Sequence, residues 1–166
     1  MAISLRPTMV FRQYSSLRAS LLREHGVTLL LSDLDYTLAP RSRRFPDEGV
    51  RVWLAELERN GITVVVISNN RNGERAKDFC APLGIDFVRF AGKPSTRGLQ
   101  EALERTGKKK EETAMLGDKL LTDVLAANRF GIPALMVEPL EGPVGAWNHV
   151  LHFLQRPFKA AAKGRF

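Results

Sequence analysis

The sequence predicts an α/β fold, a three-layer sandwich in which helices cover both faces of a doubly wound, Rossmann-like parallel sheet. Two observations support this prediction. Short apolar runs alternate along the chain with segments of helical spacing, which is the order that repeated βα units require. The apolar runs are also continuous, as in strands buried on both faces of a sheet. A length of 166 residues, with 44% hydrophobic and 26% charged residues, predicts that residues 1–166 form one globular domain.

Five strands and four helices are expected between residues 28 and 137. The strands are the apolar runs 28–32, 62–67, 86–88, 113–116 and 134–137. The helices lie between them, at about 47–59, 73–81, 95–106 and 121–130. In the first helix, Val50, Trp53 and Leu57 recur at helical spacing, and Asn60-Gly61 after them is a common stop signal.

The net charge of +7 comes from the two ends of the chain. Residues 1–25 carry four arginines against one glutamate, and residues 156–166 carry four cations and no acid. The segment between them has equal numbers of acidic and basic residues. This distribution favours a neutral core with basic ends that contact phosphate-bearing partners such as anionic lipid or nucleic acid. The alternative is that both ends are solvated tails that aid solubility.

Both basic ends also carry apolar residues at helical spacing. We expect residues 1–25 to form a basic amphipathic segment and residues 144–166 to form a helix with a basic tail. The N-terminal stripe is Val10, Tyr14, Leu17 and Leu21, and the C-terminal stripe is Trp147, Val150, Leu151 and Leu154. Such stripes either pack on the sheet or lie at the surface of a membrane, where basic residues add affinity.

The sequence contains no apolar run long enough to span a bilayer and no secretory signal, which predicts a cytoplasmic protein, peripheral on the inner face of a membrane if its ends bind lipid. The first 23 residues, with four arginines, four serines and no acid, also have the composition of a mitochondrial transit peptide, which leaves a matrix location open. The single cysteine, Cys80, excludes an internal disulfide and a multi-cysteine zinc site.

Polar or charged residues follow the first four predicted strands. They are Asp33 and Asp35 after the first strand, Ser68 and Asn69 after the second, Lys93 after the third and Asp118 after the fourth. The carboxyl ends of parallel strands meet at one edge of a sheet, where open α/β proteins bind their ligands. The sequence therefore predicts one functional site at this edge.

Aspartates, a lysine and a serine at one edge predict phosphoryl-transfer chemistry. Carboxylate oxygens suit Mg²⁺, and a divalent cation would let Asp33 and Asp35 stay ionised although only one residue separates them. Lys93 could neutralise a phosphate, and Ser68 could hold its oxygens. An aspartate can form an aspartyl-phosphate, while a second carboxyl group serves as acid and base. The expected reaction is hydrolysis of a phosphate monoester with Mg²⁺ as cofactor.

Four short motifs carry a resemblance to a known family. They are DLDYTL at 33–38, SNN at 68–70, KP at 93–94 and GDKLLTD at 117–123. In order and spacing they resemble motifs one to four of the haloacid dehalogenase-like phosphatase superfamily. The segments LRPTMVFRQYSSL (5–17), HGVTLLLSDLDYTL (25–38) and GDKLLTDVLAANRFG (117–131), with the basic tail, resemble its capless subfamily IIIA. That branch includes YqeG-like proteins and phosphatidylglycerophosphate phosphatases.

The resemblance implies a role for each motif residue. Asp33 would be the nucleophile and a Mg²⁺ ligand, Asp35 the general acid and base and a ligand through its carbonyl, and Asp118 a further metal ligand. Ser68 and Asn69 would hold the phosphoryl group, with Lys93 neutralising it. Thr37 would brace the first motif, and Asp123 would support the metal ligands from behind.

The resemblance also implies a sheet order of 3-2-1-4-5 for the predicted strands. Caps in this superfamily are inserted after motif one or between motifs two and three, and residues 36–61 and 71–92 are too short to contain one. Two positions depart from the branch's pattern. Tyr36 stands where asparagine is common, and Lys119 stands where an uncharged polar residue is common.

An uncapped site suits a phosphate carried by something large. The leading hypothesis is dephosphorylation of phosphatidylglycerophosphate to phosphatidylglycerol in phospholipid biosynthesis, with an anionic phospholipid as partner and membrane contact through the basic ends. The alternative keeps the chemistry and takes a nucleic-acid end or a nucleotide as substrate. A non-catalytic phosphorylated signalling module is disfavoured, because its acidic pair, hydroxyl and lysine fall on the strands in another order.

Overall fold

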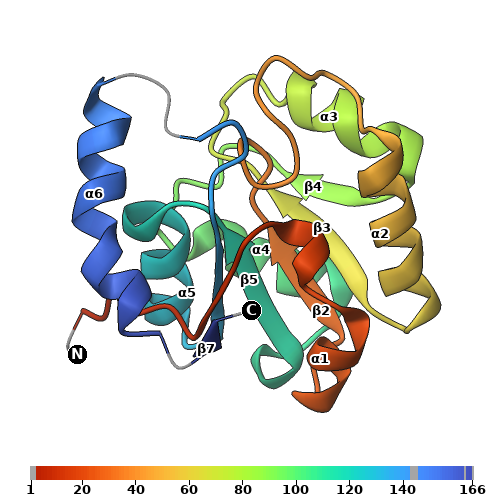
Figure 1. The fold of residues 1–166 in the computed structure, drawn as a ribbon. Helices are drawn as coiled ribbons and strands as arrows, with labels where there is room; N and C mark the ends of the chain where they lie inside the picture. Colours follow the sequence, from red (N-terminus) through yellow and green to blue (C-terminus); the bar gives the residue numbers. More distant parts are fainter. Residues whose placement is uncertain (1–2, 143–145, 163, 166) are drawn as a thin grey trace.

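A seven-stranded parallel sheet organises the protein (Figure 1). The computed structural model describes residues 3–142, 146–162 and 164–165. The strands are β1 (Met9–Phe11), β2 (Leu29–Ser32), β3 (Thr63–Ile67), β4 (Asp86–Val88), β5 (Thr113–Gly117), β6 (Ala134–Val137) and β7 (Gly164–Arg165). Their order across the sheet is β4-β3-β2-β5-β6-β1-β7. The five predicted strands thus occur in the implied order, and β1 and β7 extend the sheet beyond β6.

Helices cover both faces of the sheet, which confirms the three-layer sandwich. Residues of α1 (Ala19–Glu24), α2 (Glu48–Arg59) and α3 (Glu74–Cys80) belong to the core on one face. Residues of α4 (Arg97–Thr106) and α5 (Leu125–Phe130) belong to the core on the other. The helix α6 (Ala146–Ala160) lies on the opposite side of the molecule from α2 (Figure 1). Residues 33–47 and 68–85, which the structure describes throughout, contain no inserted domain, so the site carries no cap.

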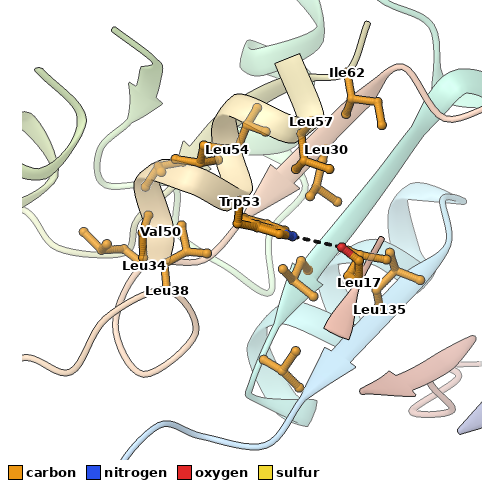
Figure 2. Close-up of a cluster of buried hydrophobic side chains, with 14 of the residues drawn as sticks. Leu17, Leu30, Leu34, Leu38, Val50, Trp53, Leu54, Leu57, Ile62 and Leu135 are labelled. Atoms are coloured by element: carbon orange, nitrogen blue, oxygen red, sulfur yellow. Dashed lines mark hydrogen bonds between the residues drawn. The ribbon is translucent and has the colours of Figure 1, made fainter. Parts of the chain in front are cut away.

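The helix α2 forms where its periodicity predicts. The Asp47 side chain accepts a hydrogen bond from the Val50 amide at 2.9 Å, which caps the amino end. The apolar face is buried, and the Trp53 indole donates to the Leu17 carbonyl at 2.9 Å (Figure 2). Burial of each large apolar side chain contributes about 1.5–3 kcal/mol, so this face holds α2 and the N-terminal segment against one another.

The prediction of one helical stripe in the N-terminal segment is wrong. Residues Met9–Phe11 form β1, which pairs with β6 so that Met9 lies opposite Leu135. A strand alternates its faces, so Val10 packs in the core on the α4–α5 face, whereas Leu17, after the strand ends, packs on the opposite face. The stripe residues therefore stabilise the protein's interior, while Arg12 and other arginines of this segment are exposed.

The C-terminal segment contains the predicted helix but divides its apolar stripe. Leu151 is half-buried, whereas Val150 and Leu154 are exposed. Of the predicted basic tail, Arg156 is exposed but Lys159 is buried against Glu138. Residues 144, 145, 163 and 166, and the side chains of Trp147 and Arg165, lie outside the described part of the structure. No helix within the described residues is both long and apolar enough to cross a bilayer.

Candidate active site

The predicted site residues gather at the carboxyl edge of the sheet. Asp33 follows β2, Ser68 follows β3, and Asp118 follows β5. Lys93 comes from the loop between β4 and α4, and Asp123 lies in a π-helical turn, Leu120–Val124, that precedes α5. All five side chains are buried. The π-helical turn accounts for the difference from the helix predicted at 121–130, and it places Asp123 inside the site.

Lys93 is held by three oxygens at the centre of the site. Its Nζ lies 2.7 Å from Asp33 Oδ1 and 2.7 Å from Asp123 Oδ1, and it donates to the Ile67 carbonyl at 2.8 Å. The contacts with Asp33 and Ile67 are hydrogen bonds, and the contact with Asp123 is an ion pair. Burial alone would lower the pKa of Lys93, but the charges of Asp123 and Asp33 raise it above its ordinary value. Lys93 therefore stays charged and fixes one oxygen of each carboxylate.

Asn69 positions the main chain of Lys93. Its side-chain oxygen accepts a hydrogen bond from the Lys93 amide at 2.9 Å, and its nitrogen donates to the Lys93 carbonyl at 3.0 Å. The Ser68 hydroxyl accepts from the Asn70 amide at 3.2 Å. Since the Asn69 side chain is committed to Lys93, a contact of Asn69 with a phosphoryl group would have to come from its backbone N–H.

Asp33, Asp118 and Asp123 form the acidic cluster, in which one oxygen from each residue lies within 4.8 Å of the others. Burial would raise the pKa of Asp33, but the ammonium groups of Lys93 and Lys119 hold it below its ordinary value. Burial raises the pKa of Asp118 to about 7; the charges of Asp33 and Asp123 add to the rise, and Lys119 opposes it. The pKa of Asp123 is raised chiefly by its burial.

These carboxylates fit a divalent cation. Three buried carboxyl groups share two ammonium groups, so the fully ionised cluster would carry more negative charge than its lysines neutralise. Hard oxygen ligands of this kind suit Mg²⁺, and such an ion would allow all three carboxylates to ionise. The Thr37 hydroxyl donates to Asp118 Oδ1 at 3.1 Å, which joins that carboxylate to the first motif.

Asp35 lies outside the acidic cluster and pairs with arginines instead. Arg75 Nε lies 2.5 Å from Asp35 Oδ1, and Arg41 Nε lies 3.3 Å from Asp35 Oδ2. Arg75 also donates to the carbonyls of Pro40 at 2.9 Å and Arg43 at 2.5 Å, so it ties the loop after β2 to α3. Sequence reasoning missed Arg75, because no motif spacing distinguishes it from the other arginines of the chain.

The two positions that depart from the family pattern lie next to each other in the structure. Lys119 Nζ is 3.0 and 3.1 Å from the two oxygens of Asp118, 3.9 Å from Asp33 Oδ2, and 5.6 Å from the centre of the Tyr36 ring. Tyr36 itself has a φ of +65°, in the left-handed region that non-glycine residues rarely adopt. Lys119 is therefore a further cation of the acidic cluster.

A pocket of about 290 Å³ opens beside the acidic cluster. Its walls come from the site, from the π-helical turn, from the loop after β6 and from α6. The lining residues are Tyr36, Asp118, Lys119, Leu121, Thr122, Pro139, Gly142, Leu151, His152 and Gln155. The pocket thus combines charged groups beside the acidic cluster with apolar side chains such as Leu121 and Leu151.

Comparisons with known proteins agree with this geometry. A sequence model of the family described as haloacid dehalogenase-like hydrolase matches residues 9–131. The chain is 35% identical over 142 residues to "Probable phosphatase YqeG" of Bacillus subtilis (strain 168), which covers 86% of this chain and 82% of that protein.

Solved structures share the fold at low sequence identity. An uncharacterized protein from Listeria monocytogenes serotype 4b superposes with a TM-score of 0.57 at 19% identity, covering 72% of this chain and 83% of that one. The 3-deoxy-D-manno-octulosonate 8-phosphate phosphatase of Moraxella catarrhalis, solved with magnesium and phosphate ions, superposes with a TM-score of 0.50 at 16% identity. That match covers 85% of this chain and 95% of the other.

Proposed function

Since the chain belongs to the haloacid dehalogenase-like hydrolase family and is a phosphatase, we propose that it is Mg²⁺-dependent and dephosphorylates phosphatidylglycerophosphate through an aspartyl-phosphate intermediate. The observation that carries the chemistry is the setting of Asp33. Lys93 fixes its Oδ1 at 2.7 Å, and its carboxylate belongs to a cluster suited to a divalent cation. The second carboxylate oxygen is thus left to act as the nucleophile.

In the proposed mechanism, an Asp33 oxygen attacks phosphorus while the bond from phosphorus to the leaving oxygen breaks. Asp35 gives its proton to that oxygen, then takes a proton from the water that hydrolyses the aspartyl-phosphate and regenerates Asp33. Ser68, the Asn69 N–H and Lys93 hold the phosphoryl oxygens. Mg²⁺, held by Asp33, Asp118 and the Asp35 carbonyl with Asp123 behind them, would neutralise charge on the phosphoryl group.

The lipid substrate is supported by what surrounds the chemistry. The absence of an inserted domain in residues 33–47 and 68–85 leaves the acidic cluster accessible to a phosphate carried by a large molecule. The neighbouring pocket offers Lys119 for a second anionic group and Leu121 and Leu151 for apolar atoms. Phosphatidylglycerophosphate has a terminal phosphate monoester, a phosphodiester and acyl chains, which match these features in that order.

We place the enzyme peripherally on the inner face of a membrane, with its exposed basic residues towards anionic lipid. Arg12, Arg18 and Arg156 are exposed and available for such contacts. The place of β1 in the sheet argues against a transit peptide whose cleavage would remove residues 9–11, since Val10 and Phe11 are buried in the core.

Phosphate release tests this proposal. Wild type and Asp33→Asn would be assayed with and without Mg²⁺ on phosphatidylglycerophosphate in anionic vesicles, on a 5′-phosphorylated oligonucleotide and on a small aryl phosphate. Asp86→Asn is a matched control, because Asp86 is an exposed aspartate at the amino end of β4, whereas the site lies at the carboxyl ends of the strands. We expect Mg²⁺-dependent release from the lipid by wild type and Asp86→Asn and none by Asp33→Asn.

The other outcomes separate the two parts of the proposal. Release from the oligonucleotide or aryl phosphate but not from the lipid would retain the aspartyl-phosphate chemistry and refute the lipid assignment. Full activity of Asp33→Asn on any substrate would refute Asp33 as the nucleophile.

A further inference from the structure

The helix α6 exposes apolar side chains along one face. Val150, Phe153, Leu154 and Phe158 are 48%, 66%, 56% and 38% exposed. Residues spaced by three and four positions lie on the same side of a helix, so these four form one continuous stripe, here called the α6 stripe. A surface helix normally turns such a stripe towards the core, and α6 does the opposite.

Polar contacts on the other side of α6 set this orientation. Lys159 Nζ lies 2.7 Å from Glu138 Oε2, and His152 Nε2 lies 2.9 Å from the same oxygen. Gln155, which lies between these two residues in the sequence, is buried and lines the pocket beside the acidic cluster. The inner face of α6 is therefore the polar one, which contacts Glu138 directly after β6, and the α6 stripe lies on the outward face.

The charge of α6 indicates what covers the α6 stripe. The helix contains no aspartate or glutamate, and the exposed Arg156 lies between Leu154 and Phe158 in sequence. The helix has two cations, Arg156 and Lys159. Lys159 pairs with Glu138, which leaves the exposed Arg156 to contact an external anion. Apolar side chains beside an exposed cation suit the interface of an anionic bilayer. At 15 residues the helix is too short to cross the hydrocarbon core, so it would lie in the plane of the surface.

We propose that the α6 stripe inserts into the surface of an anionic membrane and that α6 presents the catalytic pocket to lipid headgroups. The same helix forms one wall of that pocket through Leu151, His152 and Gln155, whereas Asp118 and Lys119 form the wall beside the acidic cluster. A headgroup that leaves the bilayer beside α6 and enters this space would thus lie next to Asp118 of the acidic cluster. This inference rests on the proposed lipid substrate and adds the surface through which that substrate arrives.

Vesicle binding of the full-length protein tests the proposal. Phe153→Ser/Leu154→Ser would be compared with wild type by co-sedimentation with vesicles of phosphatidylcholine alone and of phosphatidylcholine with phosphatidylglycerol. Val52→Ser is the matched control, because Val52 is an equally exposed apolar residue, 55% exposed, on α2. We expect wild type and Val52→Ser to bind the anionic vesicles, and the double variant to bind roughly ten-fold or more weakly.

Activity on two substrates distinguishes docking from catalysis. The double variant should hydrolyse a water-soluble aryl phosphate at the wild-type rate and lose hydrolysis of phosphatidylglycerophosphate in vesicles. Vesicle binding equal to wild type would overturn the proposal, as would a wild type that hydrolyses the lipid in detergent micelles without binding vesicles. If wild type binds the vesicles and the double variant does not, but wild type does not hydrolyse the lipid, the proposed substrate is refuted and the docking surface is retained.

A second copy of the chain is the rival occupant of the α6 stripe. Analytical ultracentrifugation of the same variants distinguishes a second copy of the chain from a membrane. A wild-type dimer that the double substitution converts to a monomer, with vesicle binding unchanged, would identify a subunit interface and refute membrane docking.

Discussion

Replacing Lys93 with methionine should destabilise the protein strongly at neutral pH. Methionine approximates the length of lysine but removes the ammonium group that lies 2.7 Å from both Asp33 and Asp123. The Lys93 side chain is only 2% exposed, so water cannot replace the lost partner. Removing one member of a buried ion pair costs about 3–5 kcal/mol, and here two carboxylates lose the same partner. We expect a loss of this size in the free energy of unfolding at pH 7.5.

The loss should depend on pH in a definite direction. In the wild type the pKa of Asp33 is held below its ordinary value because Lys93 and Lys119 outweigh its burial. A lowered pKa in the folded state contributes stability above the unfolded value of about 3.9, and that contribution disappears as the pH falls through the folded value. Without Lys93 this contribution is lost and burial raises the pKa of Asp33. The difference between variant and wild type should therefore be largest near pH 7.5 and shrink towards pH 4.5.

A second substitution makes the prediction sharper. Asp123→Asn removes one of the two charges that Lys93→Met leaves unpaired, so the double variant should be more stable at pH 7.5 than Lys93→Met alone. Urea unfolding followed by circular dichroism, in EDTA, measures each free energy, with Lys77→Met as a control for loss of an exposed lysine. Two results would refute the electrostatic explanation. One is a loss of unfolding free energy in Lys93→Met that is the same at pH 4.5 and pH 7.5. The other is a double variant whose loss equals the sum of the losses of Lys93→Met and Asp123→Asn.

Three further predictions concern the same edge of the sheet. Without metal, the pKa of Asp118 is raised to about 7, so the contribution of Asp118 to stability falls as the pH rises from about 4 to 7. Mg²⁺ should therefore raise the melting temperature more at pH 8 than at pH 5.5, and an equal gain at both would contradict this. Gly117→Ala would place a Cβ 2.3 Å from Cβ and Cγ of Asp123, so we expect a loss of about 1–3 kcal/mol with lost phosphatase activity; a wild-type melting curve and rate would show that the turn can yield. Arg75→Gln removes one of the two arginine partners of Asp35 and the hydrogen bonds to the loop after β2, which should lower stability by about 1–3 kcal/mol in urea unfolding. The control Arg44→Gln, at an exposed ion pair, should change it by less than about 1 kcal/mol.

The central sheet and the acidic cluster could be predicted because they depend on rules that act along the chain. Continuous apolar runs mark buried parallel strands, and the residues directly after them must meet at one edge. Asp33 and Asp118 are brought together by this rule, and Lys93 joins them from the loop that follows β4. Asp123 was expected behind the metal ligands, and one of its oxygens lies within 4.8 Å of an oxygen of Asp33 and of Asp118; it comes from the π-helical turn that follows β5.

Contacts between distant segments could not be predicted in the same way. The strand β1 has three residues, too few to show a period of two, and its conformation is decided by β6, more than 120 positions away. Residues 9–11 in isolation suit the helical spacing of the wider segment equally well. The pairing of Arg75 with Asp35 joins residues 40 positions apart and leaves no trace in either segment alone.

The helix α6 shows what periodicity determines and what it leaves open. Helical spacing correctly indicates which side chains share a face, but it does not indicate which face is buried. That choice depends on Glu138, which lies outside the helix and draws His152 and Lys159 inward. An expectation based on hydrophobicity alone would have buried Val150 and Leu154, and their exposure is the observation from which the proposed membrane docking of α6 starts. Substituting Glu138 with glutamine should therefore weaken the contacts of His152 and Lys159 that orient α6 without changing the α6 stripe itself. Vesicle binding should then persist, while hydrolysis of phosphatidylglycerophosphate in vesicles declines.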